Sequence, residues 1–299
     1  METRRTFIKH TAMIATGGLL LPDMALRAED KSSKAAGKII GIQIYTVRKK
    51  INKDLESTLK KVAETGYKNI EAYGYQNRQI LGKTPQEFRK LVEGLGMKMP
   101  SSHTVTELTS EESKGSLLDS WKVTVEDMYT AGAQYLVYAF LQPSERTCPD
   151  DYKRLAEQFN RFGEISNDAG IRFGYHNHDF EFIELQGLKG YDLLMDLTEP
   201  RLVMFEPDLY WMTKAGIDPL TYFNKYPGRF ELWHIKDMED SESRTFTEVG
   251  SGTVDFKRIF TGRETAGMKL FFVEQDLSKI DEFESIKMSF DYLNKAEFV

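Results

Sequence analysis

Cysteine is almost absent from this chain, and it has no long run of positive charge. Its 299 residues include one cysteine, Cys148, which leaves no partner for an internal disulfide and too few thiolates for a multi-cysteine zinc site. Lys and Arg number 40 against 46 Asp and Glu, so the net charge is −6, and no Lys/Arg-rich run stands out. Because nucleic-acid binding requires basic side chains that neutralise phosphates, the composition argues against a nucleic-acid partner.

A long apolar run is also missing. The apolar stretch from Thr11 to Leu21 is too short to cross a hydrocarbon core of roughly 30 Å as a helix. It follows the pair Arg4-Arg5, and this pattern resembles a bacterial twin-arginine (Tat) export signal. We therefore expect residues 1–28 to be a cleavable signal peptide and residues 29–38 a polar linker. The mature protein is then expected to be periplasmic, more acidic than the full chain and without a stable membrane anchor.

Beyond the linker, short segments rich in β-branched and aromatic residues alternate with segments of helical periodicity. The clearest helical segments are 55–66, 85–96 and 152–170, and each ends in a glycine that is typical of a helix C-terminus. The expected strands are residues 39–47, 69–75, 98–104, 135–140, 172–180, 202–211, 231–238 and 269–276. Eight such units predict an α/β fold, a single (β/α)8 TIM barrel over residues 39–299. An open doubly wound sheet is the alternative, but the first strand is not followed by a glycine-rich phosphate loop.

Four histidines lie toward the carboxyl ends of these predicted strands. They are His103 on the third strand, His176 and His178 on the fifth, and His234 on the seventh. For any one of them taken singly, a buried structural histidine bonded to a neighbour is commoner than a ligand. In a barrel, however, the carboxyl ends of the strands converge on one face, where active sites are built. The set therefore predicts a functional cluster on that face.

Acidic side chains share these strand ends. Unpaired carboxylates are costly to bury in apolar, β-prone segments, so a cation or a network of sugar hydroxyls is expected to satisfy them. Mixed imidazole and carboxylate ligands suit Mn²⁺, Zn²⁺, Co²⁺ or Fe²⁺. The residues concerned are Glu71, Glu206, Asp208, Asp237, Glu274 and Asp276.

Strand alternation places Lys236 on the same side as His234. A cation and desolvation would lower the pKa of this lysine and make it a proton donor or acceptor. The alternative is a lysine that is simply paired with a barrel carboxylate. The same reasoning puts His176 and His178 on one side, and Glu206 and Asp208 on one side.

Several of these motifs resemble the sugar phosphate isomerase/epimerase superfamily, the xylose-isomerase-like TIM barrels. The matching segments are GIQIYTVR (41–48), YHNHDFEF (175–182), FEPDLYWMTKAG (205–216), LWHIKDM (232–238), VGSGTVDF (249–256) and FFVEQD (271–276). The resemblance implies a divalent metal, most often Mn²⁺, with one ligand from each of the last four strands. Carried over by motif, these ligands are His176, Asp208, His234 and Glu274. His176 stands where the family usually has Glu, and His178, Glu206 and Glu181 are alternative ligands.

The resemblance also implies chemistry through an enediolate. We expect a metal-dependent isomerase or epimerase acting on an unphosphorylated, keto-type sugar, with Glu274 or His176 as the base. The alternative is a lyase or dehydratase that cleaves a 3-keto-glycoside or an inosose by β-elimination. Lys236 or His103 would then protonate the leaving oxygen. His176 in place of Glu counts against a symmetric two-carboxylate epimerisation, and the HNH and HIKD patterns look closer to the inosose-dehydratase-like members.

Substrate contacts are expected from Glu71, His178, Glu206 and Trp211. The GSGT segment (250–253) is either a phosphate-binding loop or a simple turn, and the turn is favoured. A DNA-repair endonuclease of the same barrel type is disfavoured by the acidic charge and by too few ligands for a trinuclear zinc centre. A binding module without catalysis is the other alternative. The partner is therefore expected to be a small carbohydrate, and the sequence carries no signal for an oligomeric state.

Overall fold

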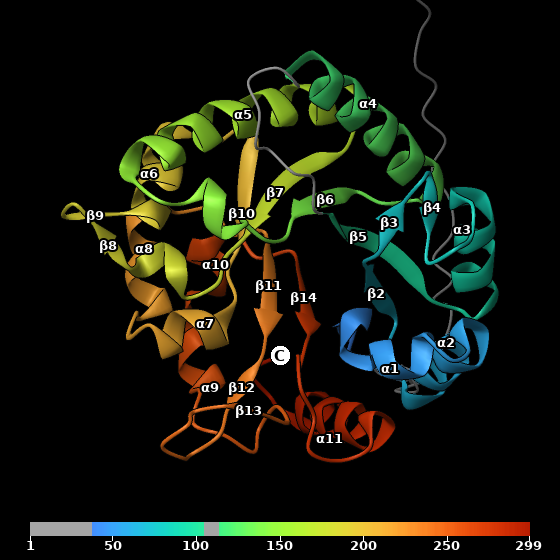
Figure 1. Ribbon diagram of the computed structural model, residues 1–299. Coiled ribbons are helices and arrows are strands. Elements are labelled where there is room, and N and C mark those ends of the chain that lie inside the picture. The colour runs from blue at the N-terminus through green and yellow to red at the C-terminus, as the bar shows by residue number, and fades with distance from the viewer. Residues whose placement is uncertain (1–37, 105–113) are drawn as a thin grey trace, which may run out of the picture. The chain divides into compact units, whose positions relative to one another are not determined.

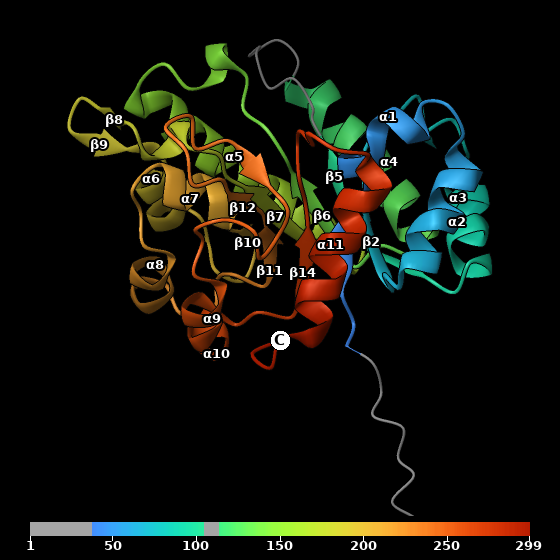
Figure 2. The same cartoon turned by 90° about the horizontal axis from the view of Figure 1, so that it is seen from below.

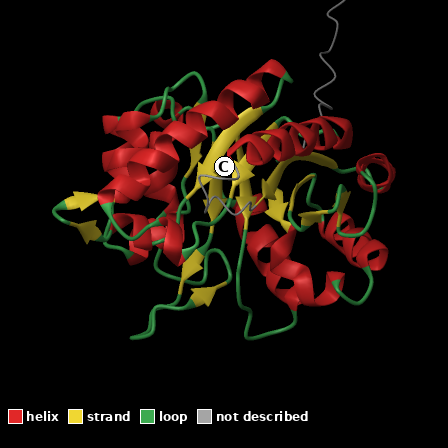
Figure 3. Cartoon of the chain, turned by 45° about the horizontal axis from the view of Figure 1, so that its top comes forward, coloured by secondary structure: helices red, strands yellow, loops and turns green. Residues whose placement is uncertain are grey.

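The computed structural model describes residues 38–104 and 114–299. The predicted signal peptide and all but the last residue of the predicted linker lie outside these residues. None of the helices described is both long enough and apolar enough to span a membrane. The described residues form an α/β barrel in which helices surround a central parallel sheet (Figures 1 and 3).

All eight predicted strands are present and pair in parallel in chain order. The sheet order is β10-β7-β6-β5-β2-β1-β14-β11. The strands are β1 (Gly41–Gln43), β2 (Asn69–Ala72), β5 (Lys98–Thr104), β6 (Tyr135–Tyr138), β7 (Arg172–His176), β10 (Val203–Glu206), β11 (Leu232–Ile235) and β14 (Leu270–Val273). The TIM-barrel prediction is therefore confirmed, with a barrel that is nearly closed.

The barrel closes along a narrow seam between β10 and β11. The N–H of Phe205 donates to the carbonyl of Arg229 at 2.7 Å, and the N–H of His234 donates to the carbonyl of Pro207 at 3.0 Å. Asp208 and His234 form an isolated parallel bridge at this seam. Two of the predicted site residues therefore face each other because the sheet closes there.

Helices cover the outside of the sheet, and Figure 2 shows α11 running across the strands in that view. Helix α3 begins with a capping box between Thr84 and Glu87, and Asp54 caps α2. Gly66, Gly96, Gly132 and Gly170 have positive φ at or just past helix ends, as predicted. The α-helices are α1 (Arg48–Ile51), α2 (Leu55–Thr65), α3 (Pro85–Gly94), α4 (Lys114–Ala131), α5 (Pro149–Asp168), α6 (Gly190–Leu197), α7 (Leu209–Lys214), α8 (Pro219–Lys225), α9 (Phe256–Ile259), α10 (Arg263–Ala266) and α11 (Glu282–Lys295).

Three two-stranded hairpins are inserted after barrel strands. They are β3 (Tyr75–Gln76) with β4 (Gln79–Ile80), β8 (Glu184–Leu185) with β9 (Leu188–Lys189), and β12 (Asp237–Met238) with β13 (Phe246–Thr247). Each follows the carboxyl end of a strand, the side on which TIM barrels build their sites.

Several predicted strands were too long at their carboxyl ends. Residues Ile44–Val47 form a 3-10 helix instead of extending β1. The segment predicted as strand to residue 211 stops at Glu206, because Asp208 accepts the N–H of Trp211 and starts helix α7. Asp208, Lys236 and Glu274 thus lie just beyond the strands, in the segments that follow them.

Two apolar cores support the site. The larger lies between the sheet and the helices, and a small one fills the barrel interior with Val137, Met204, Leu232 and Phe272. Phe272 of this small core packs directly against the backbone of Gly41. A Cβ added there would lie 2.6 Å from the Phe272 ring and 2.7 Å from the carbonyl oxygen of Phe271. The interior is therefore packed beneath the site and does not form a channel.

We expect Gly41→Ala to lower the free energy of unfolding by about 1–3 kcal/mol, the usual cost of overpacking a tight interior. The backbone oxygen at 2.7 Å cannot move away as a side chain could. Gly94→Ala is the control, because nothing lies within 4 Å of an added Cβ and the helical position favours Ala. Thermal or denaturant unfolding compares the two variants, and equal stabilities would contradict this packing.

Candidate metal and sugar site

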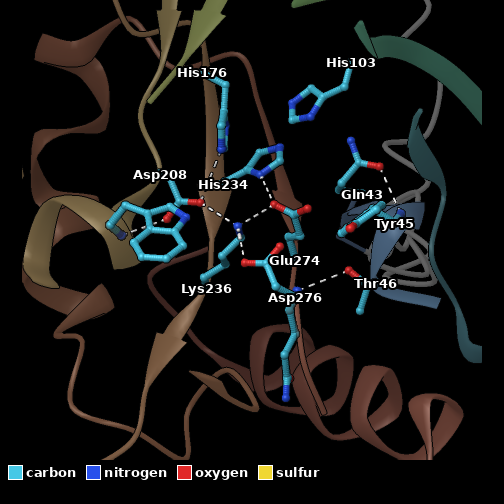
Figure 4. A network of polar contacts seen from close by, with 12 residues as sticks. Gln43, Tyr45, Thr46, His103, His176, Asp208, His234, Lys236, Glu274 and Asp276 are labelled. Carbon is cyan, nitrogen blue, oxygen red and sulfur yellow. Dashed lines mark hydrogen bonds and ion pairs between the residues drawn. The ribbon is translucent and has the colours of Figure 1, made fainter. Parts of the chain in front are cut away.

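A cavity of about 490 Å³ opens at the carboxyl ends of the strands. One wall is aromatic, and the opposite end is polar and carries most of the predicted catalytic side chains. The cavity is lined by Tyr45, Tyr73, Gly74, Tyr75, His103, Thr104, Ala139, Phe140, Gln142, His176, His178, Lys236, Glu274 and Asp276. Figure 4 shows the polar end, where side chains from strands far apart in the sequence point toward one another.

One cluster joins the four residues proposed above as metal ligands. His176, Asp208, His234 and Glu274 each offer a donor atom within 4.8 Å of the others, and all four are buried. His176 ends β7, His234 lies in β11, Asp208 caps α7, and Glu274 follows β14. The Nε2 atom of His176 is 3.6 Å from Asp208 Oδ2, and Nδ1 of His234 is 2.7 Å from Glu274 Oε2.

A second layer of carboxylates lies beneath these imidazoles. Glu206 Oε2 is 2.7 Å from His103 Nε2 and 3.2 Å from His176 Nδ1. Glu71 Oε2 is 2.6 Å from His234 Nε2 and also accepts a hydrogen bond from the Gln43 amide at 2.9 Å. Both glutamates are fully buried, and neither lines the cavity.

Lys236 carries the positive charge of the site. Its Nζ lies 2.8 Å from Glu274 Oε2, 3.0 Å from Asp208 Oδ2 and 2.9 Å from Asp276 Oδ2 (Figure 4). Burial opposes the charged form, but these three carboxylates raise the pKa of Lys236 well above its ordinary value. Lys236 is therefore paired with barrel carboxylates, as in the alternative given above, and the expectation that a bound cation lowers its pKa stays a prediction.

The imidazoles divide into charged and neutral ones. Burial disfavours the charged form of His234, but Glu206, Glu274 and Glu71 outweigh it and raise its pKa well above the usual value. Burial and the nearby imidazoles His234, His103 and His178 lower the pKa of His176 well below it. Burial and Lys236 lower the pKa of His178 to about 3. His176 and His178, which face the cavity from the end of β7, are therefore neutral near pH 7.

The carboxylates respond to the same environment. Burial alone would raise the pKa of Glu274, but Lys236 and His234 lower it strongly, so this group is ionised. Burial and the negative charge of Glu71 raise the pKa of Glu206 to about 7. An ionised Glu274 on the cavity wall is a suitable proton acceptor.

His103 and His178 lie where the sequence placed them, on the cavity. His103 is 9% exposed and stacks on His234 with ring centroids 4.9 Å apart. His178 stacks on Phe180 and touches Phe140 edge-on, and its buried Nδ1 has no hydrogen-bond partner. This nitrogen is free to bond a polar group that enters the cavity.

Other predicted site residues lie away from the cavity. Glu71 and Glu206 are enclosed beneath the histidines, so the prediction that they contact substrate is not supported. Trp211 packs behind His178 with ring centroids 5.4 Å apart and does not line the cavity. Glu181, the suggested replacement ligand, accepts hydrogen bonds from the Tyr175 hydroxyl and the His178 N–H and is absent from the cluster.

The GSGT loop is occupied by a side chain of the protein itself. The N–H groups of Gly250, Gly252 and Val254 donate to the carboxylate of Asp237 at 2.8–3.1 Å. An added Cβ at Gly252 would lie 2.4 Å from Asp237 Oδ1, so this close approach requires glycine. Asp237 therefore points away from the site, and the loop is a turn with its amides already bonded.

Some contributors were not identified from the sequence. Asn177 accepts the N–H of Asp208 at 3.2 Å and helps to hold that ligand segment, and Gln43 and Ser101 bond Glu71. Phe140, which lines the cavity beside His178, is another. Gln43 could have been found as a polar residue inside the apolar run of β1, whereas Ser101, in a largely polar strand, and the loop residue Asn177 have no such signal.

The donor set fits a divalent ion. Atoms that share a metal at about 2.0–2.3 Å lie at most about 4.6 Å apart. No two of these four donor atoms are more than 4.8 Å apart, so small movements would bring all of them to ligand distance of one ion. Two imidazoles with two carboxylates suit borderline ions such as Zn²⁺ or Mn²⁺. The fully buried Asp208 Oδ2 and Glu206 Oε1 accept no hydrogen bond, although Lys236 lies within ion-pair distance of the former. Buried carboxylate oxygens left in this state favour an added cation.

Comparison with known proteins supports this fold. The family model described as "Xylose isomerase-like TIM barrel" matches residues 59–276. A crystal structure titled as a sugar phosphate isomerase/epimerase from Parabacteroides distasonis is 31% identical, with a TM-score of 0.81 over 90% of this chain and 97% of that one. A structure of the IolI protein "with a binding zinc atom" has a TM-score of 0.69 at 15% identity, covering 88% of this chain and 99% of that one, which shows the fold alone.

Curated relatives are inosose dehydratases. The one from Lacticaseibacillus casei is 30% identical over 164 residues, which is 48% of this chain. The match spans about half of that relative, 54% of its length. The one from Geobacillus kaustophilus is 22% identical over 273 residues, which cover 80% of this chain and 86% of the relative.

Proposed function

Because the chain belongs to the xylose isomerase-like TIM barrel family, we propose that it is a metal-dependent enzyme acting on a carbonyl-bearing sugar or cyclic polyol. The reaction removes the proton next to the carbonyl and expels an oxygen from the neighbouring carbon. His176, Asp208, His234 and Glu274 would hold the ion. When bound, a divalent ion supplies Lewis acidity that lowers the energy of negative charge on the substrate oxygen.

The observation that carries elimination is the unequal distribution of acids and bases. Glu274, ionised and on the cavity wall, accepts the proton. The ammonium of Lys236, 2.8 Å away on the same side, donates a proton to the leaving oxygen. The opposite side, at the end of β7, offers His176 and His178, both neutral. Neither of these two is a charged proton donor, so the Glu274–Lys236 pair, with base and acid on one side, favours syn elimination. Burial lowers the pKa of His103, but Glu71 and Glu206 outweigh it and raise the pKa, so His103, which also lines the cavity, is a second proton donor.

One feature supports an unphosphorylated substrate. The amides of Gly250 and Gly252 in the GSGT loop are bonded to Asp237 and are not free to bind a phosphate. We propose in addition that residues 1–28 direct export to the periplasm, where free sugars and oligosaccharides are available. The isomerase or epimerase reading is the second candidate, supported by similarity to the Parabacteroides distasonis protein over 90% of the chain.

Turnover in D₂O tests this function. The protein loaded with Mn²⁺ is incubated with inososes, free ketoses and 3-keto-glycosides, and proton NMR follows the products. We expect loss of water or of an aglycone, with an unsaturated keto product. Deuterium incorporation into an epimer or a ketose–aldose isomer without bond cleavage would instead establish the second candidate.

A further inference from the structure

Glu206 and Glu71 are two buried carboxylates that the proposed reaction does not use. Both are 0% exposed, and neither lines the cavity, so neither can touch a substrate. Each lies against the imidazoles of the ligand cluster. Burying two carboxylates is costly unless they have a specific role or specific partners.

The contacts are selective for one nitrogen of each imidazole. Glu206 bonds His176 through Nδ1 at 3.2 Å, and the other nitrogen, Nε2, is the one that faces Asp208. Glu71 bonds His234 through Nε2 at 2.6 Å, and the other nitrogen, Nδ1, is the one that faces Glu274. In both cases the carboxylate bonds the nitrogen that points away from the ligand carboxylates.

We infer that Glu206 and Glu71 are positioning residues that fix the two ligand histidines as opposite tautomers. An imidazole that donates one N–H to a carboxylate keeps a lone pair on its other nitrogen, in a fixed direction. His176 is therefore held as the Nδ1–H form, which offers Nε2. When an ion displaces the proton of Nδ1, His234 is held as the Nε2–H form, which offers Nδ1. This inference rests on the metal-dependent function proposed above.

The same geometry accounts for His103. Its Nε2 is 2.7 Å from Glu206 Oε2 and 3.1 Å from Glu71 Oε2, so it lies between the two glutamates. A competing assignment exists, because His103, His176, Glu206 and His234 also group closely enough to hold an ion. In that arrangement Glu206 would be a metal ligand, and the ion would lie on Nδ1 of His176 and Nε2 of His234. The two assignments share these histidines, so the ring nitrogens that bind the ion distinguish them.

Metal titration of the apoprotein gives the first test. We expect the wild-type chain to bind one Zn²⁺ or Mn²⁺, and Glu206→Ala to bind it about 10–100-fold more weakly, the usual effect of losing an orienting carboxylate. Glu206→Gln keeps one acceptor oxygen and should fall between them. Glu181→Gln is the matched control, a buried carboxylate near the site that bonds Tyr175 and His178 only, and its affinity should be unchanged.

A spectroscopic test needs no variant. In ¹⁵N-histidine-labelled protein loaded with ¹¹³Cd²⁺, the metal should couple to Nε2 of His176 and to Nδ1 of His234. Coupling to any other pair of ring nitrogens, such as Nδ1 of His176 and Nε2 of His234, would overturn the inference. So would two ions per chain with the second lost in Glu206→Ala, or unchanged affinity in a folded Glu206→Ala protein.

These outcomes separate the inference from the function. A wild-type chain that binds one ion with the predicted coupling but turns over no carbohydrate would disprove the proposed reaction and leave the tautomer assignment intact. Turnover of a carbohydrate, together with an unchanged metal affinity of Glu206→Ala, would disprove the tautomer assignment and leave the proposed reaction intact. A wild-type chain that binds no divalent ion would overturn both.

Discussion

Replacing Glu274 by Gln is expected to lower kcat by about 10²–10⁴-fold, the usual contribution of a positioned general base. The amide keeps the size of the side chain but cannot accept the proton. Lys236 at 2.8 Å and His234 at 2.7 Å keep the carboxylate ionised, which is the form that accepts a proton. Steady-state kinetics at saturating metal measure the effect on the substrate found by NMR.

The control is Glu231→Gln at the other end of the barrel. Glu231 pairs with Arg172 at 3.0 Å and accepts the Tyr135 hydroxyl at 3.2 Å, so its loss affects stability. Its kcat should equal that of the wild type. A Glu274→Gln enzyme with normal kcat would remove Glu274 from the reaction and would also call its place among the metal ligands into question.

Metal affinity of the apoprotein is expected to fall about tenfold for each pH unit below the raised pKa of His234. In the described structure both ring nitrogens of His234 lie against carboxylates, Nδ1 at 2.7 Å from Glu274 and Nε2 at 2.6 Å from Glu71. The raised pKa means that this imidazole is protonated at neutral pH. A metal on Nδ1 must displace that proton.

The direction of this pH dependence follows from the protonation states of the other ligands. His176 has a lowered pKa and is neutral, and Glu274 has a lowered pKa and is ionised, so neither releases a proton near neutral pH. The slope of log affinity against pH is therefore expected to be near +1 below the His234 pKa and to level off above it. Calorimetry in buffers of different ionisation enthalpy counts the released protons. Binding without proton release at pH 6 would contradict this arrangement.

The barrel itself was predictable because its signal is local and repeated. Each strand is a short β-prone segment, and several helices carry an apolar stripe and end at or just before a glycine such as Gly66 or Gly170. Right-handed βα connections leave little topological choice once eight such units are counted. The ends of the strands were less predictable, because a cap such as Asp208 competes with continued extension, and the sequence shows no more than the residue type.

The sequence predicted which residues form the site better than it predicted what each of them does. Strand alternation correctly placed His176 with His178, and His234 with Lys236, on one side. Strand alternation does not show how deeply each side chain is buried. Glu206 and His176 both occupy strand ends, but one lies beneath the imidazoles and the other lines the cavity. The high pKa of Lys236 likewise depends on three carboxylates that approach it only when the barrel closes.

That closure has a mechanical consequence. Few backbone hydrogen bonds link the β10 and β11 sides of the barrel. Asp208 follows β10, and His234 lies across from it in β11. An ion held by both side chains would therefore crosslink the two segments at the place where the barrel has few hydrogen bonds between neighbouring strands. Binding of the ion would then stabilise the closed barrel, and its loss would weaken the contact between β10 and β11 at the site itself.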